Sequence, residues 1–371
     1  MLRTLRNLLV QIIAIFIRDR DARHKFRNTY KRKSKFRKLR DDNKRIFNDI
    51  GHLIGEVTSL KSDLASIKAH YDQRLREWDL VNYNIFRVTP LDNSPPQGPD
   101  TNVFLAITCI SKNEGPYLKE WIEYHKIVGV ERFYFYDNES DDDTKDILEP
   151  YIKDGTVVYH FLPNNPITKL KNQDSAYNDS IFKYRDRTKW MAFIDIDEFI
   201  VPVEKNTIPE FLSDYEQYPG VVINWMCFDS NDHENKPTSN GGLVTANYTR
   251  TRKDHNVNLD KVVKSIVNPR VVVYMSTHYG LFAGNAEAIT EKYQKNRGGT
   301  TKFHSSKKIR INHYHTKSRE EYAKKIERNS KGNIWTHVFN ESLLNFPEET
   351  VADFTIQKYV PQLKHAIGIT K

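Results

Sequence analysis

The chain has 371 residues, 38% of them hydrophobic and 12% aromatic, and this composition excludes a globally disordered protein. Its formal net charge of +9 is concentrated in residues 1–46, which hold 16 Lys and Arg against 4 Asp and Glu, whereas the rest of the chain holds 41 Lys and Arg against 44 Asp and Glu. The nearly neutral body disfavours a nucleic-acid-binding enzyme. Cys109 and Cys227 lie in apolar stretches without metal-like spacing, so we expect reduced thiols in the core.

Residues 1–45 combine a short apolar run with many basic side chains. The run from Leu8 to Ile17 is about half of the ~20 residues that a membrane-spanning helix needs. No small-residue cleavage site follows it, which disfavours a cleaved secretory signal. An apolar run beside clustered Lys and Arg is typical of a segment that lies on an anionic membrane surface. We expect such a segment here; the alternative is a solvated basic tail or a nucleic-acid arm.

Residues 46–88 begin with an apolar seam. Its members recur at alternating steps of four and three residues: Ile46, Ile50, Leu53, Val57, Leu60, Leu64, Ile67 and Tyr71. This heptad spacing predicts a coiled-coil helix that joins copies of the chain into a homo-oligomer. The alternative is a helix folded back on the body. Residues 89–101 contain four prolines and one glycine, a composition that predicts a linker.

Strands and helices alternate from residue 102 onward. Apolar runs rich in β-branched and aromatic residues predict strands over 103–110, 132–137, 156–162, 190–197 and 220–228. The patterns between them predict helices over 116–129, 141–152 and 172–185. This alternation predicts an α/β domain over residues 102–332 with a mostly parallel sheet flanked by helices. Residues 333–371 are expected to form a helical extension, with a helix pair over 351–369 that packs on the body.

The predicted strands end in polar residues at 111–115, 137–143 and 195–198, and ligands bind at the carboxyl ends of such strands. Asp195 and Asp197 terminate an apolar strand, and Glu198 follows directly. Carboxylates at this spacing can converge on one Mg²⁺ or Mn²⁺ ion, whereas without a cation their burial would be costly. The alternative is that these acids cap the next segment or pair with arginines.

A further metal ligand is expected far along the chain. His313 and His315 lie on one face of an extended segment, with Tyr314 on the other, and neutral imidazole suits Mn²⁺. The alternative is a pair of locally hydrogen-bonded histidines. The sequence contains no G-x-G-x-x-G or Walker A motif, which disfavours a dinucleotide fold or a phosphate-cradling loop. A metal must therefore neutralise much of the charge of any bound diphosphate.

Several motifs follow one another in a fixed order over residues 102–332: ISKNEGPYLKEWIEYHKIVGVERFYFYDNESDDD, AYND, KWMAFIDIDEFIVP, VVINWMCFDS, KSIVNPR, HY and INHYHTKS. As an ordered set they closely resemble glycosyltransferase family 92 and its bacterial family-2-like relatives. The resemblance implies a GT-A fold, in which a nucleotide-binding α/β half is joined to an acceptor-binding half. It also implies inverting transfer of a sugar from a nucleotide-activated donor with a divalent metal.

The resemblance assigns roles to single residues. Asp195, Asp197 and His313 would hold the metal and, through it, the donor diphosphate. His315 stands where the family pattern varies. The residues implied in donor binding are Ser111, Lys112, Asn113 and Glu114 near the nucleoside, Asp137 at the base or ribose, and Lys317 near the diphosphate.

One stretch departs from the family pattern. The family's FGSxGH reads FDSNDH here, so Asp229 and Asp232 replace small residues while His233, an expected substrate-binding residue, is retained. This difference indicates a different acceptor or donor sugar. Asp232, Asp229 and Glu234 are candidates for the general base that deprotonates the acceptor hydroxyl, with Asp232 and Asp229 preferred. The alternative is a loop of solvated acids.

Together these features predict a hexosyltransferase, with galactosyl transfer from a UDP-sugar as the family-level expectation and Mn²⁺ or Mg²⁺ as cofactor. The expected acceptor is a saccharide or glycolipid in surface polysaccharide synthesis at the cytoplasmic face of a bacterial inner membrane. A Golgi type II enzyme is the weaker alternative for localisation. Alternative functions are a sugar nucleotidyltransferase, which should show a glycine-rich phosphate loop, and a non-catalytic membrane-tethered scaffold.

Overall fold

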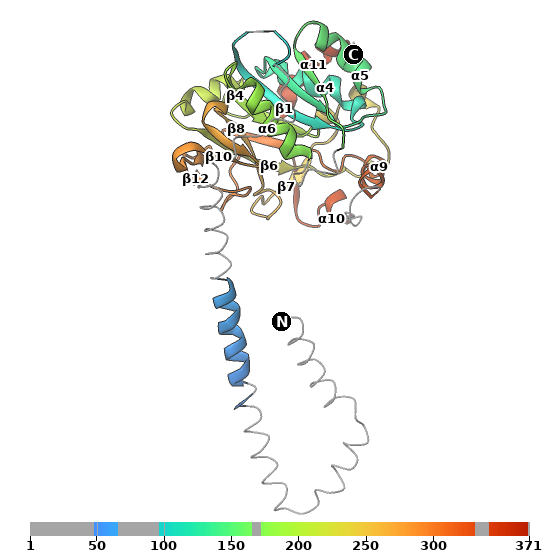
Figure 1. Cartoon of the computed structure of the whole chain (residues 1–371). Coiled ribbons are helices and arrows are strands. Elements are labelled where there is room, and N and C mark those ends of the chain that lie inside the picture. The colour runs from blue at the N-terminus through green and yellow to red at the C-terminus, as the bar shows by residue number, and fades with distance from the viewer. Residues whose placement is uncertain are drawn as a thin grey trace, which may run out of the picture. The chain divides into compact units, whose positions relative to one another are not determined.

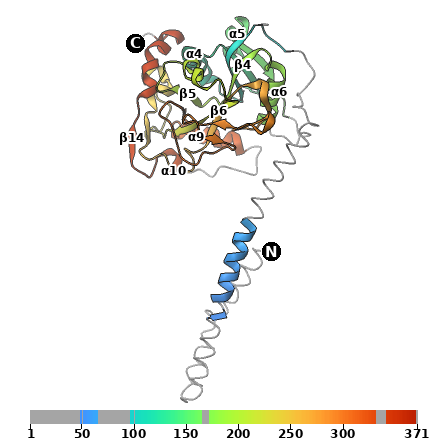
Figure 2. The same ribbon diagram turned by 90° about the vertical axis from the view of Figure 1, so that its left-hand side faces the viewer.

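The computed structural model describes residues 48–49, 51–65, 96–99, 101–164, 172–330 and 341–369. The chain divides into two compact units, Met1–Ile85 and Phe86–Lys371 (Figures 1 and 2). The C-terminal elements belong to the same unit as the sheet, and the predicted domain bounds stay predictions. Among the described residues, no helix has both the length and the apolar character needed to cross a bilayer.

In the first unit the structure describes helical residues at 48–49 and 51–65, and all of them are exposed. The exposed residues include four members of the apolar seam, Leu53, Val57, Leu60 and Leu64, whose relative exposures run from 39% to 64%. The other members of the seam, the basic segment 1–45 and most of the linker lie outside the described residues. The coiled coil and the membrane-surface segment therefore stay predictions.

The second unit is built around a ten-stranded sheet. Its strands are β1 (Val103–Ser111), β2 (Arg132–Asp137), β3 (Val157–Phe161), β4 (Thr188–Phe193), β5 (Glu198–Pro202), β6 (Gly220–Cys227), β8 (Val263–Val267), β11 (Ala288–Ile289), β12 (Lys295–Asn296) and β13 (Ile309–His313). The order is β12-β11-β6-β8-β4-β1-β2-β3, and β13 pairs with β6 and β5. Two small sheets pair β9 (Val272–Met275) with β10 (Gly280–Phe282), and β7 (Arg250–Arg252) with β14 (Thr350–Ala352).

The strand directions bring several carboxyl ends to one edge of this sheet. β1 runs parallel to β2 and β4, and β2 runs parallel to β3. β8 is antiparallel to both β4 and β6, so β6 runs in the direction of β4. β13 is parallel to β6. The carboxyl ends of β1, β2, β4, β6 and β13 therefore share an edge, as the predicted parallel sheet requires.

Helices cover both faces of the sheet (Figure 1). On one face, α4 (Gly115–Ile127), α5 (Thr144–Lys153) and α11 (Val360–Ile367) join a core cluster through Trp121, Leu148 and Leu363. On the other face, α6 (Asn172–Tyr184) contributes Tyr177 and Ile181 to a second cluster. The other α-helices described in this unit are α7 (Ile208–Leu212), α8 (Val244–Asn247), α9 (Arg319–Ser330) and α10 (Glu341–Leu344).

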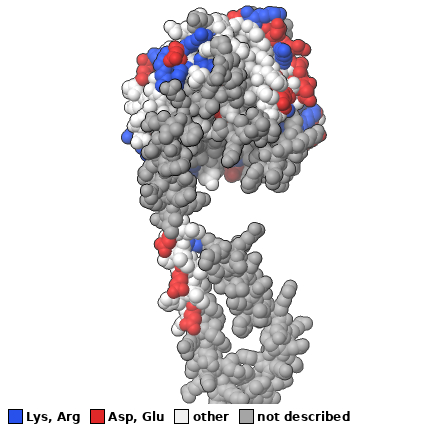
Figure 3. Space-filling view, viewed as in Figure 1, with Lys and Arg blue, Asp and Glu red and all other residues white. Residues whose placement is uncertain are grey.

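Local sequence accounts for several element ends. α4 carries Pro116 in its first turn, and Gly129, at φ +101°, follows its C-terminus. α7 begins with a capping box between Thr207 and Glu210. Cys109 and Cys227 are buried and unpaired, which confirms the predicted core thiols. Lys and Arg side chains are mixed with Asp and Glu on the described surface seen in Figure 3.

Two predicted elements were wrong at their ends. The strand expected to reach Asp197 stops at Phe193, because the backbone turns there and the Glu198 N–H donates to the Asp195 carbonyl at 3.1 Å. The helix pair expected near the C-terminus is a helix, α11, preceded by strand β14 and a 3₁₀ turn over Thr355–Tyr359. Pairing of β14 with β7 holds this segment in an extended conformation.

Candidate metal and donor site

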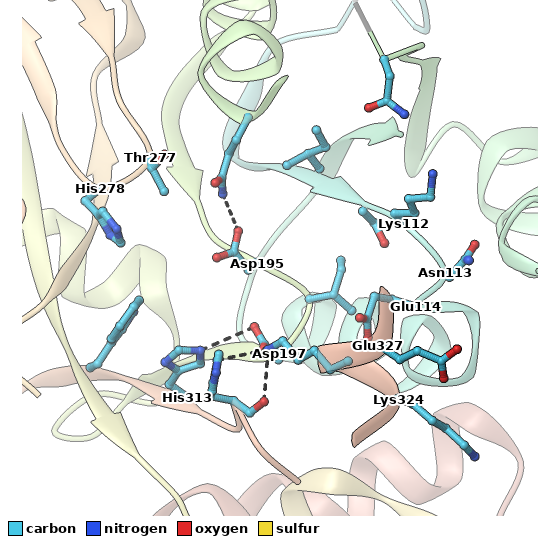
Figure 4. Close-up of a pocket in the computed structure, with 18 of the residues that line it drawn as sticks. Lys112, Asn113, Glu114, Asp195, Asp197, Thr277, His278, His313, Lys324 and Glu327 are labelled. Atoms are coloured by element: carbon cyan, nitrogen blue, oxygen red, sulfur yellow. Dashed lines mark hydrogen bonds and ion pairs between the residues drawn. The ribbon is translucent and has the colours of Figure 1, made fainter. Parts of the chain in front are cut away.

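A cavity of about 1110 Å³ lies at the shared carboxyl edge of the sheet. Its wall combines residues at or just after the ends of β1, β4 and β13 with residues of α9 (Figure 4). The lining residues are Ile110, Ser111, Lys112, Asn113, Glu114, Asp141, Asn164, Gln173, Asp195, Ile196, Asp197, Trp225, Thr277, His278, His313, His315, Lys324, Lys325 and Glu327. A cavity with many converging polar groups is the expected form of a small-molecule site.

Three side chains in this wall could hold one cation. One potential ligand atom each from Asp197, His313 and His315 lies within 4.8 Å of the others. Nε2 of His313 is 3.7 Å from Oδ1 of Asp197, and the two side chains are 6% and 11% exposed. Nδ1 of His313 is buried without a hydrogen-bond partner among the described residues. One carboxylate and two imidazoles form a donor set that fits a divalent transition metal such as Mn²⁺.

Strand pairing places the two histidines. β13 lies between β5 and β6, with His313 opposite Glu198 on one side and Cys227 on the other. Tyr314 is fully buried in the core and its N–H donates to the Asp197 carbonyl at 2.9 Å. The predicted alternation is confirmed, because His313 and His315 line the cavity while Tyr314 packs into the core.

Asp195 belongs to a different cluster from Asp197. Its Oδ2 accepts a hydrogen bond from Nζ of Lys264 at 2.8 Å, and its Oδ1 accepts one from Nε2 of Gln173 at 2.6 Å. Nζ of Lys264 also lies 3.7 Å from Oε2 of the fully buried Glu198. The structure therefore does not bring Asp195 into the group of three possible ligands. Lys264 was not singled out from the sequence, although it belongs to the motif KSIVNPR.

The charges of this region are set by burial and by neighbouring ions. Burial would lower the pKa of Lys264, but Asp195 and Glu198 outweigh it and hold the pKa above its usual value. Burial raises the pKa of Glu198 well above its usual value despite the attraction of Lys264. For Asp197, burial acts to raise the pKa, but Lys325 and His313 outweigh it and hold the pKa well below the usual range. Asp197 therefore stays ionised at neutral pH.

Lys325 of α9 contacts two of the three possible metal ligands. Its Nζ is 2.6 Å from Oδ2 of Asp197 and 3.1 Å from both Nδ1 and the carbonyl oxygen of His315. Burial lowers the pKa of His315, and Lys325 and His313 lower it further, so this imidazole is neutral. No sequence signal in residues 319–330 marked Lys325 as part of the site.

The residues expected to bind the donor divide into two groups. Ser111, Lys112, Asn113 and Glu114 line the cavity, and Asn113 adopts a left-handed φ of +56° while its Nδ2 donates to Asp141 at 2.6 Å. The rest lie outside the cavity wall: Asp137 accepts hydrogen bonds from Tyr159 and the Ser140 N–H, Lys317 lies 4.2 Å from the centre of the Tyr117 ring, and the His233 ring lies 5.6 Å from that of Tyr248.

Asp229 and Asp232, the expected general bases, also lie outside the cavity wall. Nε of Arg250 donates to both oxygens of Asp229 at 2.7 and 2.9 Å, and its terminal nitrogens donate to Asp232 at 2.5 and 3.0 Å. The hydrogen bond from Arg250 lowers the pKa of Asp232, which makes this carboxylate a weaker base. Their catalytic role stays a prediction, and in the structure both carboxylates accept hydrogen bonds from Arg250.

Comparison with known proteins gives relatives that are named as glycosyltransferases. The model of glycosyltransferase family 92 matches residues 107–366. Galactan beta-1,4-galactosyltransferase GALS3 of Arabidopsis thaliana is 28% identical over 210 residues, which cover 53% of this chain and 38% of that protein. Glycosyltransferase family 92 protein Os08g0121900 of Oryza sativa subsp. japonica is 29% identical over 117 residues, covering 32% and 19%. The chain thus spans less than half the length of these relatives.

Among solved structures, S. aureus TarS (residues 1–349) aligns with a TM-score of 0.31 and 12% identity, covering 65% of this chain and 69% of TarS. A mannosyltransferase of Pyrobaculum calidifontis, solved with GDP-Man and Mn²⁺, aligns with a TM-score of 0.24 and 16% identity, covering 45% and 46%.

Proposed function

Because this chain belongs to glycosyltransferase family 92, we propose that it transfers a hexose from a nucleoside-diphosphate donor to a saccharide acceptor with the help of a divalent cation. The observation that carries this proposal is the convergence of Asp197, His313 and His315 in the cavity at the carboxyl edge of the sheet. Ligands of open α/β sheets bind at this edge. The residues that follow β1 supply hydrogen-bonding groups for the nucleoside on the other side of the same cavity.

The proposed cation is held by Asp197, His313 and His315. A bound Mn²⁺ or Mg²⁺ ion would stabilise the negative charge of the nucleoside diphosphate as it leaves. The other contacts to the donor would come from side chains of the protein. Lys264 and Gln173 hold the Asp195 carboxylate at the cavity wall, where it is 35% exposed and can accept hydrogen bonds from hydroxyl groups of the donor.

The proposed reaction inverts the configuration at the anomeric carbon and needs a base for the acceptor hydroxyl. A base must come within hydrogen-bonding reach of the proton that it removes. Among the described residues, the carboxylates of the cavity wall other than the proposed metal ligand Asp197 are Glu114, Asp141, Asp195 and Glu327. We infer that the base belongs to this set rather than to the pair held by Arg250.

We propose galactose as the transferred sugar and UDP as the carrier. The support is the name of three relatives, the galactan beta-1,4-galactosyltransferases GALS1, GALS2 and GALS3 of Arabidopsis thaliana. The test is release of nucleoside diphosphate by the purified full chain from UDP-galactose, UDP-glucose, UDP-N-acetylglucosamine and GDP-mannose, each with Mn²⁺, Mg²⁺ or EDTA. We expect release from UDP-galactose that EDTA abolishes and Mn²⁺ restores. Release of pyrophosphate from UTP and galactose 1-phosphate, with no release of UDP from UDP-galactose, would instead indicate a nucleotidyltransferase.

We propose that residues 1–45 bind the cytoplasmic face of a bacterial inner membrane and that residues 46–88 form an oligomeric coiled coil, with surface polysaccharide or glycolipid as the product. The support is the basic, partly apolar first segment and the heptad seam. Vesicles containing phosphatidylglycerol should sediment the full chain, and neutral phosphatidylcholine vesicles should not. Sedimentation of Leu60→Lys as a monomer at a concentration where the wild type is oligomeric would support the coiled coil.

A further inference from the structure

The Lys325 ammonium already occupies the contacts that a cation in the proposed metal site would make. It approaches Oδ2 of Asp197 to 2.6 Å and Nδ1 of His315 to 3.1 Å, so two of the three possible ligands already contact a side chain of the same protein. Its side chain is 21% exposed, and that of Asp197 is 11% exposed. Solvent screens a pair at this depth poorly, which makes the interaction stronger than a surface ion pair.

The hydrogen bond to His315 has a consequence for ligation. A lysine ammonium has three donors and no acceptor, so Nδ1 of His315 must be the acceptor in this contact. A neutral imidazole has only one nitrogen lone pair, and the other nitrogen carries the proton. While Lys325 stays in place, His315 therefore has no lone pair left for a metal.

We propose that Lys325 is a resident cation of this site and that a divalent metal can bind Asp197, His313 and His315 together only after displacing it. The inference rests on the proposed metal site and goes beyond it by naming the group with which the metal competes. The displaced ammonium stays tethered to α9 at the cavity wall, where a phosphate oxygen of the donor could accept its hydrogen bonds in place of Asp197. Lys325 would then link metal binding to diphosphate binding.

The neighbouring Lys324 supplies a matched control. It also belongs to α9 and lines the cavity, but its Nζ pairs with Glu320 at 2.6 Å, and its side chain is 68% exposed. Replacing either lysine with methionine removes one positive charge from the same wall. Only Lys325→Met removes a competitor from the ligand atoms, whereas both variants change the general electrostatic potential of the cavity.

The test is binding of Mn²⁺ alone to the full chain. It is measured at one fixed pH through the electron paramagnetic resonance signal of the free ion. We expect Lys325→Met to bind Mn²⁺ about 10- to 100-fold more tightly than the wild type, because it loses a charge-assisted hydrogen bond that metal binding must break. Lys324→Met should change the affinity less than about threefold, since its charge is exposed and screened. Lys325→Arg should stay close to the wild type, because it keeps a cation near Asp197.

A second measurement covers the case in which Lys325→Met is poorly stable. Lys325→Gln keeps a donor without the charge, and the rise of its melting temperature on adding Mn²⁺ should exceed that of the wild type, because tighter binding stabilises the folded state more. Unchanged or weaker Mn²⁺ binding in Lys325→Met would overturn the competition and make Lys325 a residue that positions Asp197.

The outcomes separate this inference from the proposed function. If the wild type binds Mn²⁺ through Asp197, as shown by loss of binding in Asp197→Asn, and Lys325→Met is no tighter, then the metal site stands and the competition is wrong. If neither the wild type nor Lys325→Met binds Mn²⁺ but the wild type releases UDP from UDP-galactose in EDTA, both the competition and the metal dependence are wrong while sugar transfer stands.

Discussion

Two acidic stretches of this protein follow strands whose carboxyl ends lie at the same edge of the sheet. Their carboxylates nevertheless differ in their position relative to the cavity and in their charged partners. After β4, Asp195 and Asp197 line the cavity and contact lysines and a histidine. After β6, Asp229 and Asp232 lie away from the cavity wall and share Arg250. The sequence predicts a functional role for both stretches, the first as metal ligands and the second as candidates for the general base.

The difference lies in the partners of the carboxylates. The planar guanidinium of Arg250 donates to both oxygens of each carboxylate, and such paired hydrogen bonds fix the geometry of an ion pair. A lysine ammonium acts as a point charge. Lys325 contacts Oδ2 of Asp197, while Oδ1 faces His313 at 3.7 Å. The two oxygens of Asp229 and of Asp232 are therefore both engaged by Arg250, whereas Asp195 and Asp197 line the cavity, where a ligand can reach them.

The sharpest test of this comparison is the replacement of one acid from each stretch. Asp197→Ala should lower the rate of donor turnover by about 10²- to 10³-fold or more, because it removes the carboxylate that helps to neutralise the leaving diphosphate. Asp229→Ala should keep turnover per folded molecule within about threefold of the wild type. Both are measured as release of UDP at saturating Mn²⁺, with circular dichroism as the check on folding. Equal losses of turnover in the two variants would contradict different roles for Asp197 and Asp229.

The next largest effect is expected on stability, at Lys264. Its side chain is 1% exposed and lies between Asp195 and the fully buried Glu198. Lys264→Met leaves these carboxyl groups without their cation, and breaking a buried pair in this way costs about 3–5 kcal/mol. Urea unfolding should show this loss. Lys189→Met, which breaks a surface pair with Glu216, should lose less than about 1 kcal/mol. A small loss at Lys264 would mean that solvent at the partly exposed Asp195 compensates for the missing cation.

A pH dependence follows from two histidines, the buried His125 and the half-buried His304. Burial lowers the pKa of His125 to about 3 and that of His304 to about 4, from an ordinary value of 6.5. In the unfolded chain both residues take up protons below pH 6.5, whereas in the folded protein they stay neutral until pH 4. The free energy of unfolding should therefore fall as the pH drops from 6.5 toward 4.

Each histidine contributes up to about 1.4 kcal/mol per pH unit to this fall. Nδ1 of His125 donates to the Trp121 carbonyl and Nε2 accepts from the Ile200 N–H, so protonation would cost one of these bonds. The check is urea unfolding at several pH values between 6.5 and 5. His125→Gln should have a shallower dependence than the wild type, and an identical slope in both proteins would contradict the assignment.

The smallest expected effect compares the two acids on Arg250. Asp229 has no exposed side-chain area, whereas Asp232 is 67% exposed. Asp229→Asn should lose about 1–3 kcal/mol of unfolding free energy, since it weakens a buried charged hydrogen bond. Asp232→Asn should lose less than about 1 kcal/mol because solvent screens it. Chemical unfolding measures both. If Asp232→Asn instead abolished sugar transfer in a stable protein, the predicted general base would be supported.

Local sequence patterns were enough to predict the strands and helices that carry the site. The strand 132–137 is confirmed at both ends, and the alternation of strands and helices is confirmed through 172–185. Parallel pairing then brings the end of β1 beside the end of β4, so the placement of Ser111–Glu114 and Asp197 in one cavity wall follows from topology. Alternation along 313–315 also predicted which side of the segment faces the ligand.

Only the tertiary structure decided which oppositely charged side chain lies beside each carboxylate of the site. Lys264 is 69 residues from Asp195, and Lys325 is 128 residues from Asp197. Hydrophobic periodicity acts over a few residues and reports which face of an element is buried, so the sequence by itself determined the sheet and the edge at which ligands bind. The energy of a buried ion depends on the distance to an opposite charge, and folding sets that distance between segments far apart in the chain. For this reason Asp195 and Asp197, two residues apart, have different lysines as partners.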